Sequence, residues 1–160
     1  MIVNFKNELN NKSVGELIKK LDEVNKEDGP HTLYFSSVGG FSSSTELLLH
    51  YLNNNCLEWN LVANHELMSN GFVLFAKFKG PKLILKETEV MLHLFGFSIN
   101  TRDDVKNEDN LKRAKLDLKE SNKELLKLYK SIKVPNKYIK RIKKGEDVML
   151  YYEDFKKFKL

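Results

Sequence analysis

The stretch LYFSSVGG, residues 33–40, carries a strand signal that breaks at two glycines. Together with Thr32, its apolar and aromatic first half is rich in residues that favour β-strands. The pair Gly39-Gly40 then ends the strand, because glycine leaves the extended conformation more readily than other residues do. The stretch therefore predicts a strand that carries a glycine turn at its end.

Strand and helix signals alternate on both sides of this stretch. Ser13 with Glu16 and Ser43 with Glu46 each have the spacing of a capping box, ahead of apolar residues that share one helical face. The alternation favours right-handed βαβ crossovers and an α/β core over a helical bundle or a β-sandwich. The expected elements are strands at 2–5, 32–35, 59–63, 82–85 and 89–92, and helices from Ser13, from Ser43 and at 71–78.

The C-terminal third of the chain is basic and has a helical pattern. Residues 111–160 hold 16 Lys or Arg against 7 Asp or Glu, within a net charge of +5 for the whole chain. Apolar residues from Leu111 to Ile132 recur at helical spacing, which predicts a long amphipathic helix after the turn-rich residues 100–110. Pro135 can open a further short helix, and Gly145 can end it.

A stripe of lysines runs along the expected long helix. Glu120 can pair with Lys123, and Glu124 with Lys127, so the stripe is expected to face solvent. The alternative is a nucleic-acid surface, but the aromatic residues of this region have no base-stacking motif around them. We therefore expect no nucleic-acid partner.

Length and composition favour one soluble domain. A chain of 160 residues can bury a core of its own, so residues 1–160 are expected to form a single domain. Cys56, the single cysteine, cannot form an internal disulfide, and neither a signal peptide nor a spanning apolar run is present. The expectation is a cytoplasmic protein with no membrane contact. His31, His50, His65 and Cys56 lack metal-ligand spacing, so neither a metal nor a cofactor is expected.

Ser69, His93 and the glycine turn supply the parts of an acyl-transfer site. A serine hydroxyl needs a base to take its proton, and the oxyanion that forms next needs preorganised amide donors. Ser69 precedes an expected helix, whose free amides and dipole favour negative charge. Two ordinary interpretations remain open, namely Ser69 as a helix N-cap and His93 as a half-buried structural histidine.

These segments resemble the motifs of the proteolytic subunit of the Clp protease family, the ClpP-like serine peptidases with a crotonase-like fold. That family has a strand ending in Asn-Ser-Pro-Gly-Gly, then Ala-Ser-Met-Gly at the nucleophile, then Met-Ile-His at the base. This chain has Ser36-Ser37-Val38-Gly39-Gly40, Met68-Ser69-Asn70-Gly71 and Met91-Leu92-His93 in the same order. The similarity covers nearly the whole chain. It implies an α/β superhelix of repeated ββα units with a protruding handle helix, in a handle region at about residues 97–134.

The resemblance also implies a role for each catalytic residue. Ser69 is the nucleophile and His93 the base, while Asp147 orients the imidazole as the third member of the triad. Asp103, Asp104 and Asp154 are possible substitutes for Asp147.

Two further sets of residues follow from the same resemblance. The backbone amides of Gly40 and Asn70 would hold the oxyanion. Residues 94–99 would lie alongside an extended peptide as an added strand. The expected substrate-binding residues are Gly39, Leu94, Phe95 and Gly96.

The chain departs from the family pattern at several positions. Val38 replaces the proline of the glycine turn, Asn70 replaces a methionine, and Leu94-Phe95 replaces Gln-Pro, but none of these changes removes a reacting atom. The chain begins almost at the first core strand, which leaves no room for the family's axial loop and makes an ATPase partner doubtful. A homo-oligomeric ring, possibly as stacked rings joined through the handle, is expected.

Three functions are in competition. The leading one is a serine endopeptidase that cleaves peptides or unfolded proteins through an acyl-enzyme. The alternatives are a catalytically inactive ClpP-like scaffold and a crotonase-like acyl-CoA enzyme, because the fold alone does not determine the chemistry.

Overall fold

A computed structural model describes residues 1–96 and 108–160 of the chain. These residues form two compact units. The first, called the sheet unit here, comprises Met1–Leu92, Met149–Phe158 and Leu160. The second, the helical unit, comprises His93–Val148 and Lys159. Within the described residues, no helix is both long enough and apolar enough to cross a membrane.

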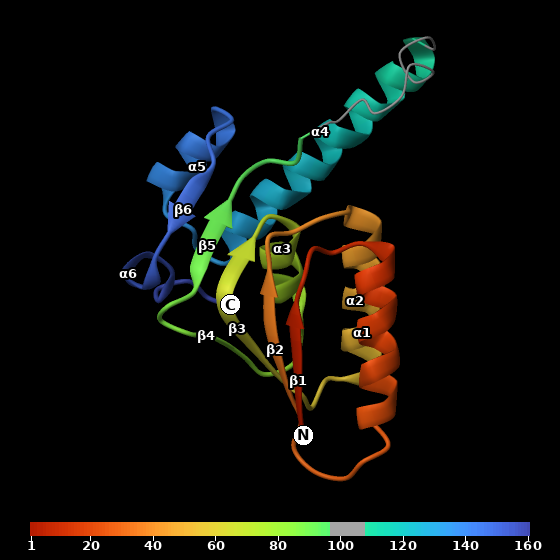
Figure 1. Cartoon of the computed structure of the whole chain (residues 1–160). Helices are drawn as coiled ribbons and strands as arrows, with labels where there is room; N and C mark the ends of the chain where they lie inside the picture. The colour runs from red at the N-terminus through yellow and green to blue at the C-terminus, as the bar shows by residue number, and fades with distance from the viewer. Residues whose placement is uncertain (97–107) are drawn as a thin grey trace. The chain divides into compact units, whose positions relative to one another are not determined.

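The sheet of the α/β fold is mostly parallel (Figure 1). Its strands follow the order β1-β2-β3-β5-β6, and β4 pairs with β3 beside this path. The register places Phe5 of β1 opposite Phe35 of β2, and Phe35 opposite Ala63 of β3. The strands are β1 (Ile2–Lys6), β2 (Thr32–Ser37), β3 (Asn60–Met68), β4 (Lys82–Ile84), β5 (Glu89–Leu92) and β6 (Val148–Leu150). The short β6 was not expected from the sequence.

Helices α1 (Asn11–Val24), α2 (Ser42–Asn55) and α3 (Asn70–Lys77) follow the first three strands in turn. Because each crossover leads to the next parallel strand in the same direction, a common hand places α1 and α2 on the same face of the sheet. In Figure 1 they lie side by side next to β1 and β2. The core is packed between these helices and the inward face of the strands, where Val3, Phe5, Leu33 and Phe35 are buried.

The predicted starts of the first two helices were wrong by a few residues. Helix α1 is capped by Asn10, whose Oδ1 accepts from the Ser13 amide at 3.0 Å, and Ser13 Oγ accepts from the Asn10 amide at 3.2 Å. Ser13 is therefore the inner partner of the capping box and not the N-cap. Helix α2 begins after Phe41 without a side-chain cap, so Ser43 lies inside it.

Strand β3 is longer than predicted and pairs with two different strands along its length. Leu61–Ala63 pair with β4, whereas Glu66–Met68 pair with β5. Between these halves His65 has a φ of 61°, which interrupts the regular extended backbone. The second half carries the strand to Met68, one residue before Ser69.

The helical unit contains α4 (Glu108–Ser131) and α5 (Asn136–Lys143), and the short α6 (Tyr152–Phe155) follows β6 in the sheet unit. Both predicted lysine pairs are present on α4, with Lys123 3.4 Å from Glu120 and Lys127 2.6 Å from Glu124. Helix α5 begins after Pro135, and the sequence predicted this start. Helix α6 was not expected. Most of the predicted turn-rich stretch 100–110 and the first part of the expected handle lie outside the described residues.

Candidate active site

Ser69 is the single residue between the end of β3 and the start of α3, at a sharp turn from strand to helix. Its backbone has a φ of 51° and a ψ of −127°, a conformation that residues with a side chain rarely adopt. Its side chain makes no capping hydrogen bond to α3. Ser69 therefore stands at the N-cap position without the extended backbone and the side-chain hydrogen bond to a first-turn amide that an ordinary capping serine has.

A strained residue of this kind needs a structure around it that holds it in place. Such conformations cost about 1–3 kcal/mol and are concentrated at functional sites. The α/β-hydrolases also present their nucleophile on a strained strand-to-helix turn at the edge of a sheet. Ser69 occupies the N-cap position, where its carbonyl accepts from the Val73 amide at 3.2 Å, but its side chain makes no capping bond and its backbone geometry is compatible with a nucleophile.

The glycine turn lies directly against Ser69. Gly39 has a φ of +105°, and a methyl group on it would lie 2.7 Å from Ser69 Cβ and 3.1 Å from Ser69 Oγ. Gly40 has a φ of +140°, and a methyl group there would lie 2.3 Å from the carbonyl oxygen of Leu9. Only glycine can occupy either position without moving its neighbours. The structure therefore brings together the two segments that the sequence separated, residues 39–40 and 69–70.

The orientation of the Gly40 amide follows from a neighbouring hydrogen bond. The Gly39 carbonyl accepts from the Leu9 amide at 2.7 Å. In a trans peptide the carbonyl and the following N–H point in opposite directions, so the Gly40 N–H points away from Leu9. Among the described residues, no hydrogen bond of this turn uses the Gly40 amide as a donor.

The second amide predicted for the oxyanion belongs to Asn70, the first residue of α3. Amides in the first turn of a helix have no acceptor within the helix. The Asn70 nitrogen is 3.2 Å from the methyl position of Gly39, so it also borders the glycine turn. Helix α2 begins nearby at Ser42, and the positive ends of two helix dipoles therefore meet at this edge of the sheet.

The side chain of Asn70 has a role that the sequence did not reveal. It is only 5% exposed, and its Nδ2 donates to the Gly40 carbonyl at 2.7 Å and to Ser42 Oγ at 3.3 Å. An asparagine at the start of a helix is ordinarily taken as a local turn or cap residue. No sequence signal indicates that its carboxamide bonds to a segment some thirty residues earlier in the chain.

His93 and Asp147 lie together in the helical unit. His93 Nδ1 is 3.3 Å from Asp147 Oδ1, with the histidine side chain 27% exposed and the aspartate side chain 66% exposed. This contact leaves Nε2 as the ring nitrogen that would exchange a proton with a nucleophile. Tyr129 Oη donates to the His93 carbonyl at 3.0 Å, and burial raises the pKa of Tyr129, which keeps this donor protonated.

The segment after His93 is held to α4 by its main chain. The Phe95 amide donates to Asn122 Oδ1 at 2.7 Å, and Asn122 Nδ2 donates to the Phe95 carbonyl at 3.1 Å. Leu94, Phe95 and Gly96 belong to neither a helix nor a strand, and residues 97–99 lie outside the described part of the chain. A peptide that paired with Phe95 would have to displace Asn122. In an extended backbone, the N–H and C=O groups of Leu94 and Gly96 point to the edge opposite the one used by Phe95.

The substitutes considered for Asp147 differ in their surroundings. Asp154 Oδ2 accepts from the Tyr151 amide at 3.3 Å, so this carboxylate stabilises the start of α6. Asp103 and Asp104 lie outside the described residues.

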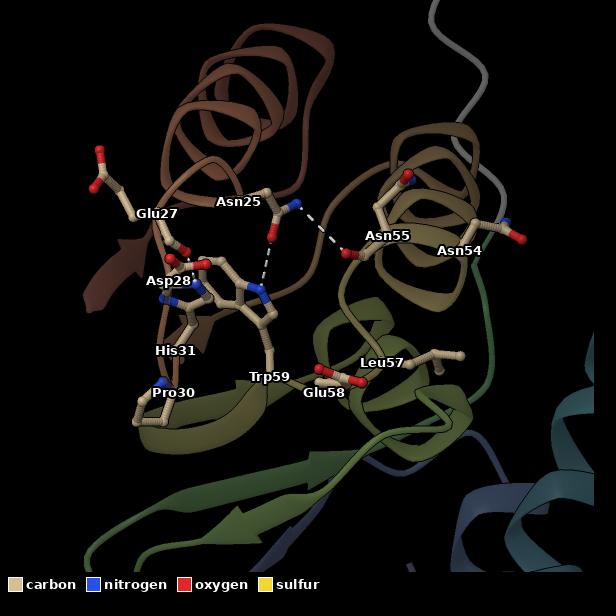
Figure 2. Close-up of a pocket in the computed structure, with 11 residues that line it drawn as sticks. Asn25, Glu27, Asp28, Pro30, His31, Asn54, Asn55, Leu57, Glu58 and Trp59 are labelled. Atoms are coloured by element: carbon tan, nitrogen blue, oxygen red, sulfur yellow. Dashed lines mark hydrogen bonds between the residues drawn. The ribbon is translucent and has the colours of Figure 1, made fainter.

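A hollow of about 660 Å³ lies at the other edge of the sheet, where β2 and β3 begin (Figure 2). Asn25 Oδ1 accepts from Trp59 Nε1 at 2.9 Å, and Asn25 Nδ2 lies 3.4 Å from the Asn55 carbonyl. The His31 ring packs on Trp59 with centroids 4.9 Å apart, and its Nε2 is 3.1 Å from the Glu27 carbonyl. These contacts join the ends of α1 and α2 to the starts of β2 and β3. They occupy the carboxamide of Asn25, the indole N–H of Trp59 and Nε2 of His31.

In comparisons with known proteins, the chain matches no family model and no curated protein. Two sets of residues carry the groups that bear on chemistry. The sheet unit holds a strained serine with two candidate oxyanion amides, and the helical unit holds a histidine paired with an aspartate. A hydroxyl beside amide donors is the type of group that serves as nucleophile and anion site, and an imidazole paired with a carboxylate is the type that serves as general base.

Proposed function

We propose that the chain is a serine peptidase of the Clp type, with Ser69 as nucleophile, His93 as base and Asp147 as the orienting carboxylate. The observation that carries this proposal is the backbone of Ser69, which is strained at the turn between β3 and α3 and packed against Gly39. The contact between His93 and Asp147 is independent support, since a triad needs that pairing.

The reaction proceeds through two acyl transfers. Ser69 Oγ attacks the carbonyl carbon of the scissile peptide bond as His93 Nε2 takes the hydroxyl proton, and the Gly40 and Asn70 amides hold the oxyanion. The C–N bond breaks, the leaving amine takes the proton from His93, and the acyl group remains on Ser69. A water molecule then gives a proton to His93, attacks the ester and releases the acid, and Ser69 regains its proton.

The surface around the glycine turn suits an extended peptide. Val38 is 48% exposed and Phe41 is 61% exposed, so apolar side chains flank the turn on both sides. Exposed apolar groups beside a reacting centre are typical of substrate or partner contacts. In the proposed binding mode the protein forms hydrogen bonds to the backbone of the substrate peptide. The groups that form them belong to Gly39 and to the main chain of Leu94 and Gly96.

The finer architecture belongs to the same proposal. The fold is taken as a superhelix of ββα units with α4 as the handle, and the working form is a homo-oligomeric ring of cytoplasmic protein. Peptides or unfolded proteins are the proposed substrates, without a nucleic-acid or membrane partner and with no cofactor. Sedimentation of the purified chain tests the ring, because a monomer at micromolar concentration would contradict it.

The activity is tested with a fluorophosphonate probe and a peptide substrate. The wild type is expected to be labelled on a single serine, and Ser69→Ala to abolish both labelling and hydrolysis. Removal of a triad serine costs several powers of ten in rate. Ser43→Ala is the matched control, because Ser43 is an exposed serine inside α2 and should leave both signals unchanged.

Two outcomes would exclude the proposal. A folded wild type that is neither labelled nor active would indicate an inactive scaffold. Hydrolysis of acyl-CoA thioesters without any peptide cleavage would indicate the crotonase-like alternative, which uses the same pair of amides on a thioester oxyanion.

A further inference from the structure

We infer that the side chain of Asn70 is a positioning residue that sets the distance between the two oxyanion amides. The inference rests on the proposed function and adds to it a role for a carboxamide that does not itself touch the substrate. The two amides belong to segments far apart in the sequence, the glycine turn and the first residue of α3. A catalytic oxyanion site needs both donors about 3 Å from one oxygen atom.

The carboxamide of Asn70 closes a short path between the two donors. From the Asn70 amide the path follows the side chain to Nδ2, crosses the 2.7 Å hydrogen bond to the Gly40 carbonyl and reaches the Gly40 amide within the same residue. A single hydrogen bond therefore links the backbone nitrogen atoms of Gly40 and Asn70, which must both point at the same oxyanion.

The glycine turn depends on such a bond more than an ordinary loop would. Glycine has no side chain to pack and has the widest conformational freedom of any residue. The Leu9 amide holds the Gly39 carbonyl on one side, and Asn70 holds the Gly40 carbonyl on the other. Together they fix both peptide units that flank Gly40, and hence the direction of its N–H.

The bond is also protected from competition by water. Asn70 is 5% exposed, and its second acceptor, Ser42 Oγ at 3.3 Å, lies at the start of α2. A buried carboxamide with satisfied donors is a strong restraint, because breaking its hydrogen bond leaves polar groups without partners. The restraint is therefore present before any substrate binds, which is what preorganisation requires.

The test compares Asn70→Met with Asn53→Met. Methionine is larger than asparagine but flexible and has no donor, so the first variant removes the tether and keeps the backbone amide, and Asn53→Met introduces the same increase in volume. Asn53 is the matched control, because its side chain ties α2 to the other end of α3 by accepting from the Lys79 amide at 2.9 Å and lies outside the proposed site. Peptide hydrolysis, inhibition by a peptide boronate and thermal unfolding are measured for both.

Asn70→Met should lower kcat about 10- to 100-fold, less than the roughly 10²- to 10³-fold loss of a whole oxyanion donor. It should weaken boronate inhibition by a similar factor, because the boronate forms the tetrahedral adduct. KM and the midpoint of the pH–rate profile should not change. Asn53→Met should change only the melting temperature. A kcat within twofold of the wild type, or equal losses in both variants, would overturn the inference.

A second measurement does not depend on turnover. Nitrogen-15 relaxation of the Gly39 and Gly40 amides should show greater backbone motion in Asn70→Met than in the wild type, and an unchanged order parameter would also overturn the inference. The two proposals fail separately. A wild type without Ser69-dependent hydrolysis removes the proposed function and the inference built on it, whereas an active wild type matched by Asn70→Met removes the inference alone.

Discussion

Ser69 and Gly39 form the pair of residues on which the candidate site depends. The serine is held in a backbone conformation that few L-residues adopt, and the glycine leaves the space that the serine fills. Each residue taken alone has an ordinary explanation, as a helix start or as a strand end. Their contact adds a feature that neither explanation requires, a glycine with positive φ packed against a strained serine.

Substitution of Gly39 tests this contact. Gly39→Ala would place a methyl group 2.7 Å from Ser69 Cβ at a φ of +105°, so the serine or the turn must shift. We expect peptide hydrolysis to fall about 100-fold or more, since misplacement of a reacting group by an ångström costs about that much. The matched control is Gly15→Ala in α1, where a methyl group meets nothing within 4 Å. It should raise the free energy of unfolding by about 0.5–1 kcal/mol. Full activity in Gly39→Ala would contradict the site.

Asp147 provides a second test at the level of one residue. Asp147→Asn should lower kcat by roughly 10- to 1,000-fold, because the amide no longer stabilises a charged imidazole. A buried triad aspartate is worth about 10⁴, but this carboxylate is 66% exposed and water competes with it. Asp154→Asn serves as the control, since Asp154 accepts from the Tyr151 amide. If Asp154→Asn were the more damaging change, the assignment of Asp147 would be wrong.

Helix α4 acts as the support for the segment that carries His93. Tyr129 donates to the His93 carbonyl, and about two turns earlier in the helix Asn122 bonds to both main-chain groups of Phe95. These polar contacts come from one side of the helix. A long helix that looked like a protruding handle from its sequence therefore also holds the proposed base in position.

Removal of the Tyr129 hydroxyl tests this support. Tyr129→Phe keeps the ring buried but leaves the His93 carbonyl without its donor, a loss of about 1 kcal/mol in the free energy of unfolding. We expect a lower melting temperature and a reduced kcat with the pH–rate profile otherwise retained. Tyr34→Phe on β2 is the control, and it should change neither quantity by as much. An equal response of the two variants would show that Tyr129 has no special link to His93.

At the scale of the whole molecule, the buried Tyr129 contributes to how stability responds to alkali. Burial raises the pKa of Tyr129 above its ordinary value of 10.0, so the folded chain keeps this proton when the unfolded chain has lost it. The folded state then binds more protons than the unfolded state, and stability falls as the pH rises above about 10. Below that pH the contribution of Tyr129 is fully present.

The measurement is the difference in unfolding free energy between the wild type and Tyr129→Phe, followed from pH 7 to pH 11 in urea. The difference should be constant at neutral pH and should shrink above pH 10, and the 295 nm absorbance that the wild type has in excess of Tyr129→Phe should appear only on unfolding. Comparison of the two proteins cancels other groups that titrate in this range, such as Lys82, whose pKa burial lowers. A difference that stayed constant to pH 11 would show that the hydroxyl of Tyr129 titrates as freely when folded as when unfolded.

The sequence by itself determined the order of the elements, because strand and helix patterns are local and repeat every two or every three to four residues. It predicted β5 and the long α4 closely, and it marked Gly39, Ser69 and His93 as residues of interest. It misplaced the start of α1, since Asn10 and Ser13 can each serve as the cap and only the packed helix selects between them. It also missed β6 and α6, which are too short to show a period.

Only the tertiary structure decided the features that bear on chemistry. One of these features is the strained φ of Ser69. The others join residues far apart in the chain, and they are the contact of Gly39 with Ser69, the hydrogen bond from Asn70 to Gly40 and the pairing of His93 with Asp147. No local pattern encodes such contacts, because a side chain has the same sequence neighbours whether or not it meets a distant carbonyl. The folded backbone supplies the missing information by placing the ends of parallel strands and the starts of helices at one edge of the sheet.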